Sequence, residues 1–122
     1  MIKGIGNDII EIDRIKIAVA KNNSFLTKIY TKQELEYYKS KGSKIQTLAG
    51  MFCAKEAVSK ALGTGFRGFG FTDIEILRNE FGRPEVRLHL KAKDIFESSN
   101  YSAIFVSISH CKTYASAISI IE

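Results

Sequence analysis

Glu56 and Lys60 are the side chains whose types and spacing could most clearly do chemistry. They stand four residues apart in the segment FCAKEAVSKALGTG, residues 52–65. In a helix, 3.6 residues per turn place this carboxylate and this ammonium one above the other on one face. The segment ends in a Gly-Thr-Gly turn, and glycine lets a backbone approach a ligand closely. We therefore expect this face to look into a cleft or a subunit contact.

A plainer interpretation is a solvated Glu–Lys pair, which stabilises a helix by only about 0.2–0.5 kcal/mol. Phe52 argues against it, because this residue shares the polar face, where a lone solvated aromatic side chain is unexpected. The opposite arc is apolar and predicts the stripe that a helix buries against a core. The stripe consists of Met51, Ala54, Ala57, Val58, Ala61 and Leu62.

Asp8 is the second candidate, and it lies near the N-terminus in a predicted strand over residues 2–11. Alternation places Gly4, Gly6 and Asp8 on one side of that strand. Glycine weakens a strand, so it commonly marks the close approach of another backbone or of a ligand, which would leave Asp8 in an open pocket. The third glycine of a dinucleotide fingerprint is missing. Asp8 fits a turn or capping carboxylate as well as a metal ligand.

Helix signals follow this strand. Asp13 is a plausible N-cap for a short first helix, and residues 31–34 and 43–46 both match the capping box. Helices should therefore start near 32 and 44. The helix that starts near 44 should run about five turns and end at Gly63, a natural glycine beyond a helix C-terminus.

The second half of the chain has the residue patterns of β-strands and hairpins. We expect strands over residues 71–77, 84–90, 103–110 and 114–121, a helix over 91–100, and hairpins at 79–83 and 111–113. This layout predicts an α+β fold, with helices packed on a largely antiparallel sheet. His110 closes a strand, where a hydrogen-bonded structural histidine is commoner than a catalytic one, and His89 is predicted to be a mid-strand surface residue.

Length and composition favour one domain over residues 1–122. No apolar run approaches the roughly 20 residues of a membrane-spanning helix, and the first residues do not resemble a signal peptide. We therefore expect a soluble cytoplasmic protein. Cys53 and Cys111 fit neither a disulfide framework nor a zinc site, and are predicted to be reduced thiols packed as small apolar groups.

The net charge of +5 is concentrated between residues 14 and 44. That segment holds eight basic residues against two acidic ones, a local balance of +6, and the rest of the chain carries about −1. Such a one-sided field attracts an anionic partner: nucleic acid, an acidic protein or a phosphorylated ligand. A merely solvated basic face is the alternative.

The segments GIGNDIIEIDRI and FCAKEAVSKALGTG, followed later by SISH, resemble the bacterial holo-acyl-carrier-protein synthases of the 4′-phosphopantetheinyl transferase superfamily. The resemblance covers nearly the whole chain, and the two longer motifs in this order are specific, whereas either alone would be weak. The matching residues are Gly4, Gly6, Asp8, Arg14, Ile15, Phe52, Ala54, Lys55, Glu56, Ala57, Lys60, Ala61, Gly63, Thr64 and Gly65.

This resemblance implies transfer of 4′-phosphopantetheine from coenzyme A to a serine of apo-acyl carrier protein, a reaction of fatty acid biosynthesis. It implies that Asp8 and Glu56 hold Mg²⁺ on the coenzyme A pyrophosphate, which suits a hard cation that prefers carboxylate oxygens. It also implies that Lys60 meets a pyrophosphate oxygen as a point charge. The general base is either Glu56 or a magnesium-bound water. By the same analogy, coenzyme A contacts come from Lys60, Gly63, Thr64, Gly65 and His110.

The family also implies partners. Acyl carrier proteins are acidic, so we expect Arg14, Lys16 and Lys21 to dock them, and no nucleic acid or membrane is expected. Family members typically form homotrimers with each active site at a subunit boundary. Two positions depart from the family pattern: Met51 stands where arginine is common, and Cys53 where alanine is usual.

Two other functions compete with this assignment. A non-catalytic basic module could bind nucleic acid through the +6 segment and the nearby Tyr30, Tyr37 and Tyr38. That alternative leaves Asp8, Glu56 and the glycine turn unexplained. An inactive scaffold subunit is disfavoured because both carboxylates are present.

Overall fold

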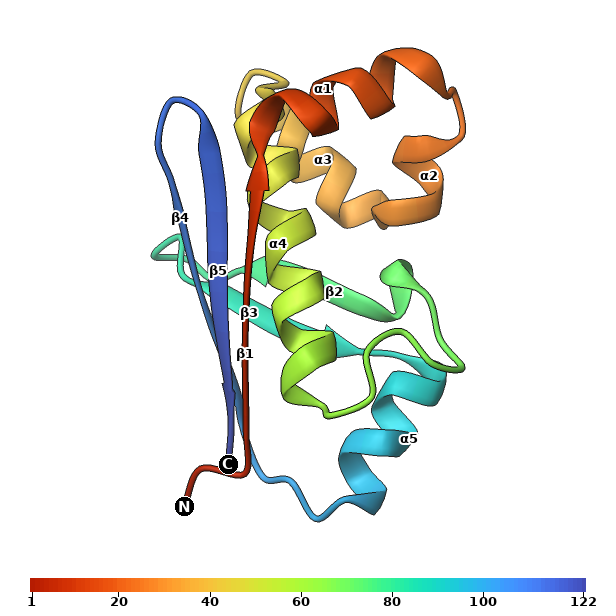
Figure 1. Ribbon diagram of the computed structural model, residues 1–122, viewed down its shortest axis with the longest axis vertical. Helices are drawn as coiled ribbons and strands as arrows, with labels where there is room; N and C mark the ends of the chain where they lie inside the picture. The colour runs from red at the N-terminus through yellow and green to blue at the C-terminus, as the bar shows by residue number, and fades with distance from the viewer.

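The computed structural model describes the whole chain, residues 1–122, as one α+β unit (Figure 1). Its elements, in order, are β1 (Gly4–Glu11), α1 (Ile12–Lys21), α2 (Phe25–Ile29), α3 (Lys32–Ser40), α4 (Ile45–Ala61), the 3-10 helix η1 (Phe71–Asp73), β2 (Ile74–Arg78), β3 (Pro84–Leu88), α5 (Leu90–Ser98), β4 (Ile104–His110) and β5 (Tyr114–Ile121). The predicted fold class is confirmed.

The larger sheet has the strand order β1-β5-β4, and both of its pairings are antiparallel. The first and last strands of the chain therefore lie side by side, with Gly4 opposite Ile121 and Glu11 opposite Tyr114. β2 and β3 form a separate antiparallel hairpin. In Figure 1 helix α4 runs along the long sheet, with α1 to α3 gathered beside its N-terminal half and α5 below the smaller hairpin.

Helix α4 lies against β1 so closely that only glycine fits between them. A Cβ atom added to Gly6 would lie 2.8 Å from the backbone nitrogen of Ala61 and 2.9 Å from Cβ of Lys60, and closer still to the carbonyl oxygen of Ala57. Gly4 would likewise collide with the carbonyl group of Ala61. Of the two sequence interpretations of these glycines, the structure therefore supports the approach of another backbone.

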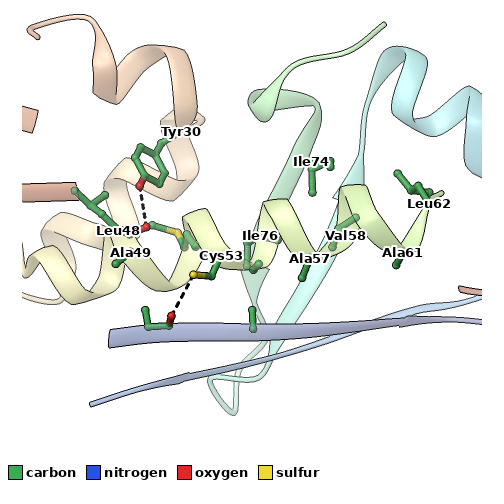
Figure 2. Packing of buried hydrophobic residues seen from close by; sticks show 14 of the residues in the cluster. Tyr30, Leu48, Ala49, Cys53, Ala57, Val58, Ala61, Leu62, Ile74 and Ile76 are labelled. Atoms are coloured by element: carbon green, nitrogen blue, oxygen red, sulfur yellow. Dashed lines mark hydrogen bonds between the residues drawn. The ribbon is translucent and has the colours of Figure 1, made fainter. Parts of the chain in front are cut away.

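The apolar stripe of α4 is buried as predicted, and it forms the centre of the core (Figure 2). Six residues of α4 outside the predicted stripe are buried as well: Leu48, Ala49, Gly50, Cys53, Lys55 and Ser59. The helix is thus enclosed on most sides, because the sheet, the smaller hairpin and the N-terminal helices all pack on it. Beyond the first turn of the helix, only a narrow face with Phe52, Glu56 and Lys60 reaches solvent.

The helix starts confirm one capping box and correct two predictions. The Thr31 side chain accepts a hydrogen bond from Glu34 N, and the Glu34 side chain accepts one from Thr31 N. The box predicted at Ser43 is wrong: Ser43 has a φ of 53°, in the left-handed region, and α4 begins after Lys44 without a side-chain cap. Asp13 is not an N-cap either, because β1 runs directly into α1 and Asp13 lies in its first turn.

The remaining differences concern short elements. α2 was not predicted, and residues 71–73 form a 3-10 turn instead of the start of a strand. His89 was predicted to be a mid-strand surface residue, which is wrong: β3 ends at Leu88, and His89 is the half-buried N-cap of α5, with Nε2 3.0 Å from Oε1 of Glu75. None of the helices combines the length and the apolar character needed to span a bilayer.

Candidate functional site

The contact between β1 and α4 brings together Asp8, Glu56 and Lys60. The Lys60 ammonium donates to the carbonyl oxygen of Asn7 at 2.8 Å and lies 3.4 Å from Oδ1 of Asp8, 52 residues away in sequence. The Asp8 side chain is 18% exposed and the Lys60 side chain 50% exposed, so the group lies at the edge of the α4–sheet interface and is open to solvent.

The two carboxylates of this group repel each other. Burial, followed by the negative charge of Asp8, raises the pKa of Glu56 above its usual value, while the positive charge of Lys60 acts in the opposite direction. Lys60 thus only partly neutralises the pair. Two hard carboxylates with surplus negative charge at an open edge suit a hard divalent cation that shares its remaining positions with water and substrate.

No group of three or more His, Cys, Asp or Glu side chains gathers in this chain to form a protein-only metal cage. The donor set is therefore two carboxylates, the number that Mg²⁺ commonly takes when substrate phosphates supply further oxygens. The residues present fit such an ion.

Cys53 lies on the sheet side of α4 and borders this group. Its thiol donates to the carbonyl oxygen of Ala115 at 3.4 Å (Figure 2). Burial first, and then the nearby Asp8 carboxylate, raise the pKa of Cys53 to about 12. The thiol stays protonated near neutral pH and acts as a packed structural group. Cys111 is free and exposed in the β4–β5 turn, so the prediction that both thiols are packed was wrong for Cys111.

The glycine turn follows the end of α4 directly. Gly63 and Gly65 have φ values of 86° and 61°, which few residues with a Cβ adopt, and a Cβ added to either would meet nothing within 4 Å. Gly63 N donates to the Lys60 carbonyl at 3.0 Å and Gly65 N to the Ser59 carbonyl at 3.1 Å. The turn is therefore anchored to the last turn of the helix while its outer side is open.

Phe52 is not a lone solvated aromatic. Its ring stacks on Phe71, with ring centroids 5.2 Å apart, and Phe71 stacks on Phe66 at 4.1 Å. The loop of residues 63–70, which leads from the glycine turn to η1, thus packs its aromatic side chains beside the helix face that carries Glu56. The sequence could not show this, because the covering rings come from a segment of irregular structure.

His110 is not brought to the carboxylates within one chain. It lies exposed at the end of β4, opposite Ala115, while Asp8 lies opposite Ala117 on the far side of β5. Two strand spacings across the sheet and two residue steps along it put the Cα atoms of His110 and Asp8 about 12 Å apart.

The basic residues predicted for docking share the first helix. Arg14, Lys16 and Lys21 are all exposed on α1, which begins directly after β1. Ile17 lies among them and is 52% exposed. Tyr30, by contrast, is buried with its hydroxyl donating to the Leu48 carbonyl at 2.8 Å, so it cannot belong to a nucleic-acid stacking surface.

Sequence reasoning missed a buried ion pair beside this site. The Lys55 ammonium lies 2.8 Å from Oε1 of Glu34, and both side chains are 0% exposed. The one available signal was that α4 is apolar around most of its circumference, which implies that a charged residue within it must find a buried partner.

Comparison with known proteins agrees with this geometry. A family model described as the 4′-phosphopantetheinyl transferase superfamily matches residues 4–118. The chain is 54% identical over 122 residues to the holo-[acyl-carrier-protein] synthase of Clostridium botulinum (strain Alaska E43 / Type E3), covering 100% of this chain and 98% of that one. It is 50% identical over 117 residues to the corresponding protein of Alkaliphilus oremlandii (strain OhILAs), covering 96% of each.

Solved structures resemble it along the same length. The holo-[acyl-carrier-protein] synthase of Neisseria meningitidis superposes with a TM-score of 0.91 at 33% identity, covering 100% of this chain and 99% of that one. The Helicobacter pylori enzyme in complex with coenzyme A gives a TM-score of 0.86 at 32% identity, covering 97% and 99%. Sequence, fold and motif order together show that this chain belongs to the 4′-phosphopantetheinyl transferase superfamily, among the holo-acyl-carrier-protein synthases.

Proposed function

We propose that this protein transfers 4′-phosphopantetheine from coenzyme A to a serine of apo-acyl carrier protein and releases adenosine 3′,5′-bisphosphate. The observation that carries the proposal is the meeting of Asp8, Glu56 and Lys60 at the open edge between β1 and α4. The relatives are named for this activity, and the Helicobacter pylori structure holds coenzyme A.

Lys60 is the proposed contact to the coenzyme A pyrophosphate. Its ammonium is half exposed, and its 2.8 Å hydrogen bond to Asn7 O holds it at the mouth of the site. Phosphoryl transfer depends mainly on placing the phosphate and stabilising developing negative charge, which a positioned ammonium does. The open backbone of Gly63 and Gly65, with the Thr64 hydroxyl between them, is proposed to bind further along the same ligand.

Asp8 and Glu56 are the proposed ligands of Mg²⁺. When bound, the ion neutralises charge on the pyrophosphate and on these two carboxylates. The serine proton needs an acceptor, and the two proposed acceptors are the Glu56 carboxylate and a magnesium-bound water. The nucleophile comes from the partner, so the protein needs no serine or cysteine nucleophile of its own.

The exposed face of α1 is the proposed docking surface for acyl carrier protein. Arg14, Lys16 and Lys21 supply positive charge to meet an acidic partner, and Ile17 supplies apolar area among them. Exposed charges of this kind mainly raise the association rate and make binding sensitive to salt.

We propose that the protein forms a homotrimer, and the exposed apolar side chains on the outer face of the larger sheet support its self-association. Ile5 and Ile9 on β1 are 63% and 66% exposed, and Ile118 on β5 and Phe105 on β4 are also exposed. The register places Ile5 beside Ile120, and Ile120 beside Phe105, so the apolar side chains form a continuous patch where a solvated sheet would be polar. We propose that neighbouring copies cover this face, and that His110 contacts coenzyme A bound to an adjacent copy.

We also propose that the protein acts in the cytoplasm. Its two cysteines are free thiols, as is usual in a reducing compartment.

The test is to incubate the protein with coenzyme A, apo-acyl carrier protein and Mg²⁺, and to follow the carrier protein by mass spectrometry. The expected result is a gain of one phosphopantetheine group, which disappears when the metal is chelated. Asp8→Asn and Glu56→Gln should abolish the gain while circular dichroism shows the native fold, because they change charge with little change in shape.

Glu97→Gln is the matched control. Glu97 is an exposed carboxylate on α5, 4.0 Å from Lys93, and its neutralisation should leave turnover unchanged. No mass gain with any divalent metal would refute the proposed activity. Full turnover in Asp8→Asn or Glu56→Gln would refute the assignment of the metal ligands.

A further inference from the structure

The buried Glu34–Lys55 pair uses every donor of its ammonium group. Lys55 Nζ lies 2.8 Å from Oε1 of Glu34 and donates to the carbonyl oxygens of Phe71 at 2.9 Å and Ile74 at 2.6 Å. An ammonium has three hydrogens, so none remains for a substrate. Lys55 therefore cannot touch the reacting atoms, although it directly precedes Glu56.

Both oxygens of the Glu34 carboxylate likewise accept hydrogen bonds. Besides Lys55, its carboxylate accepts hydrogen bonds from Thr31 N at 2.7 Å and Ile76 N at 2.8 Å. The pair thus connects four parts of the fold: the start of α3, the middle of α4, η1 and β2. Apart from the local bond from Thr31 N, each of these contacts joins segments that are distant in sequence.

The two carbonyls that Lys55 binds belong to the first residue of η1 and to Ile74, directly after η1, where the 63–70 loop joins β2. Phe71, the first residue of η1, also stacks on Phe52 of α4 and on Phe66 of the loop. The end of the loop is therefore held to α4 by two kinds of contact: hydrogen bonds from Lys55 and ring stacking on Phe52. The other end of the loop is the open glycine turn.

Lys55 also constrains the helix itself. Successive residues project about 100° apart around a helix axis. With Lys55 fixed toward η1 and β2, the rotation of α4 is set, and Glu56 is held on the side that faces Asp8.

We propose that Lys55, with Glu34 as its counter-ion, is a positioning residue for the coenzyme A subsite. It holds the 63–70 loop against α4, so that the glycine turn, Glu56 and Lys60 present one preformed surface to the ligand. This inference rests on the proposed function, since it assigns coenzyme A to that surface. It predicts that loss of Lys55 weakens coenzyme A binding and leaves carrier-protein docking on α1 intact.

A purely structural role is the competing explanation. Breaking a buried pair by removing one partner leaves an uncompensated charge and is strongly destabilising, so Lys55→Met alone is expected to fold poorly. Replacing both charges of a buried pair is often tolerated. The double variant Glu34→Gln/Lys55→Met removes both charges, and the new amide still accepts a hydrogen bond from Thr31 N or Ile76 N.

The experiment compares this double variant with wild type below the unfolding temperature of each. We expect the KM for coenzyme A to rise at least tenfold and the KM for apo-acyl carrier protein to stay within twofold. Hydrogen exchange of the amides in residues 66–74 should accelerate at least tenfold, since the loop loses its anchor. Calorimetric titration with coenzyme A should show the same weakening without turnover.

Tyr30→Phe is the matched control. It removes another buried hydrogen bond on α4, from the Tyr30 hydroxyl to the Leu48 carbonyl, and keeps the ring whose centroid lies 6.0 Å from the Lys55 ammonium (Figure 2). It should lower the unfolding temperature without changing the KM for coenzyme A or the exchange of residues 66–74.

Three results would overturn the proposal: a double variant that does not fold, an unchanged KM and titration for coenzyme A in a folded double variant, or an equal rise of this KM in Tyr30→Phe. An inactive wild-type protein would instead refute the proposed function. In that case, hydrogen exchange of the amides in residues 66–74 would still test whether Lys55 anchors the loop.

Discussion

Gly6→Ala is the most direct test of how the active site is assembled. The added Cβ would lie 2.8 Å from the Ala61 nitrogen, whereas ordinary van der Waals contact begins near 3.4 Å. The helix and the strand must therefore separate by at least 0.6 Å, and by more at the Ala57 carbonyl. Gly6 pairs with Ser119 in the sheet, so β1 is held in place and α4 is the element that must move.

Displacement of α4 has two measurable effects. Inserting a methyl group into a packed interior typically costs about 1–3 kcal/mol of stability. Moving α4 also carries Glu56 and Lys60 away from Asp8. A misplacement of catalytic groups by 1 Å can cost about a hundredfold in rate, so we expect kcat/KM to fall about ten- to a hundredfold.

The assay combines thermal unfolding by circular dichroism with the phosphopantetheine-transfer assay on the folded variant. Gly70→Ala is the control, because Gly70 has a φ of −112°, which alanine adopts readily, and an added Cβ would meet nothing within 4 Å. Gly70→Ala should retain both stability and turnover. Wild-type stability and turnover in Gly6→Ala would refute the backbone contact between β1 and α4.

Three further predictions follow from the same structure. The raised pKa of Glu56 means that the folded protein binds the Glu56 proton more tightly than the unfolded chain does, so the stability that this proton contributes in the absence of metal is lost as pH rises through the folded pKa. In urea unfolding between pH 4 and pH 7, the free energy of unfolding should therefore fall more steeply with pH in wild type than in Glu56→Gln. Equal slopes would contradict this prediction. Ile118→Asp places a charge on the apolar sheet face and should dissociate the oligomer in sedimentation experiments, whereas an unchanged mass would mean that another surface associates. Arg14→Glu and Lys21→Glu should lower the association rate with acyl carrier protein by about tenfold at low salt and much less at high salt, and unchanged kinetics at low salt would move docking away from α1.

Local patterns predicted most of the fold. The alternation of β5, the capping box at Thr31 and the glycine at position 63 are short-range signals, because the interactions that produce them are made within a few residues. One signal failed because the end of a neighbouring helix took the residue: Ser43 N donates to the Tyr38 carbonyl and closes the C-terminal end of α3. Ser43 matches the capping box in sequence, but its left-handed φ takes it out of the capping position.

The candidate site was predicted from motif spacing and family resemblance. The i,i+4 spacing places Glu56 and Lys60 on one face of any helix, so their alignment needs no tertiary information. That Asp8 lies close to Glu56 and Lys60 was expected only from the family resemblance. Nothing in the sequence between residues 8 and 56 shows that the helix packs on the strand that carries Asp8. The structure brings Lys60 to Asp8 because two glycines let the helix lie on the strand.

The sequence by itself therefore determined most of the helices and strands, the family and the candidate site residues, since these follow from local spacing and from motifs. Only the tertiary structure decided that Lys55 is buried against Glu34, that Phe52 is covered, and that His110 lies away from the carboxylates. The physical reason is that burial and charge pairing depend on which distant segments pack together, and packing is a property of the whole chain.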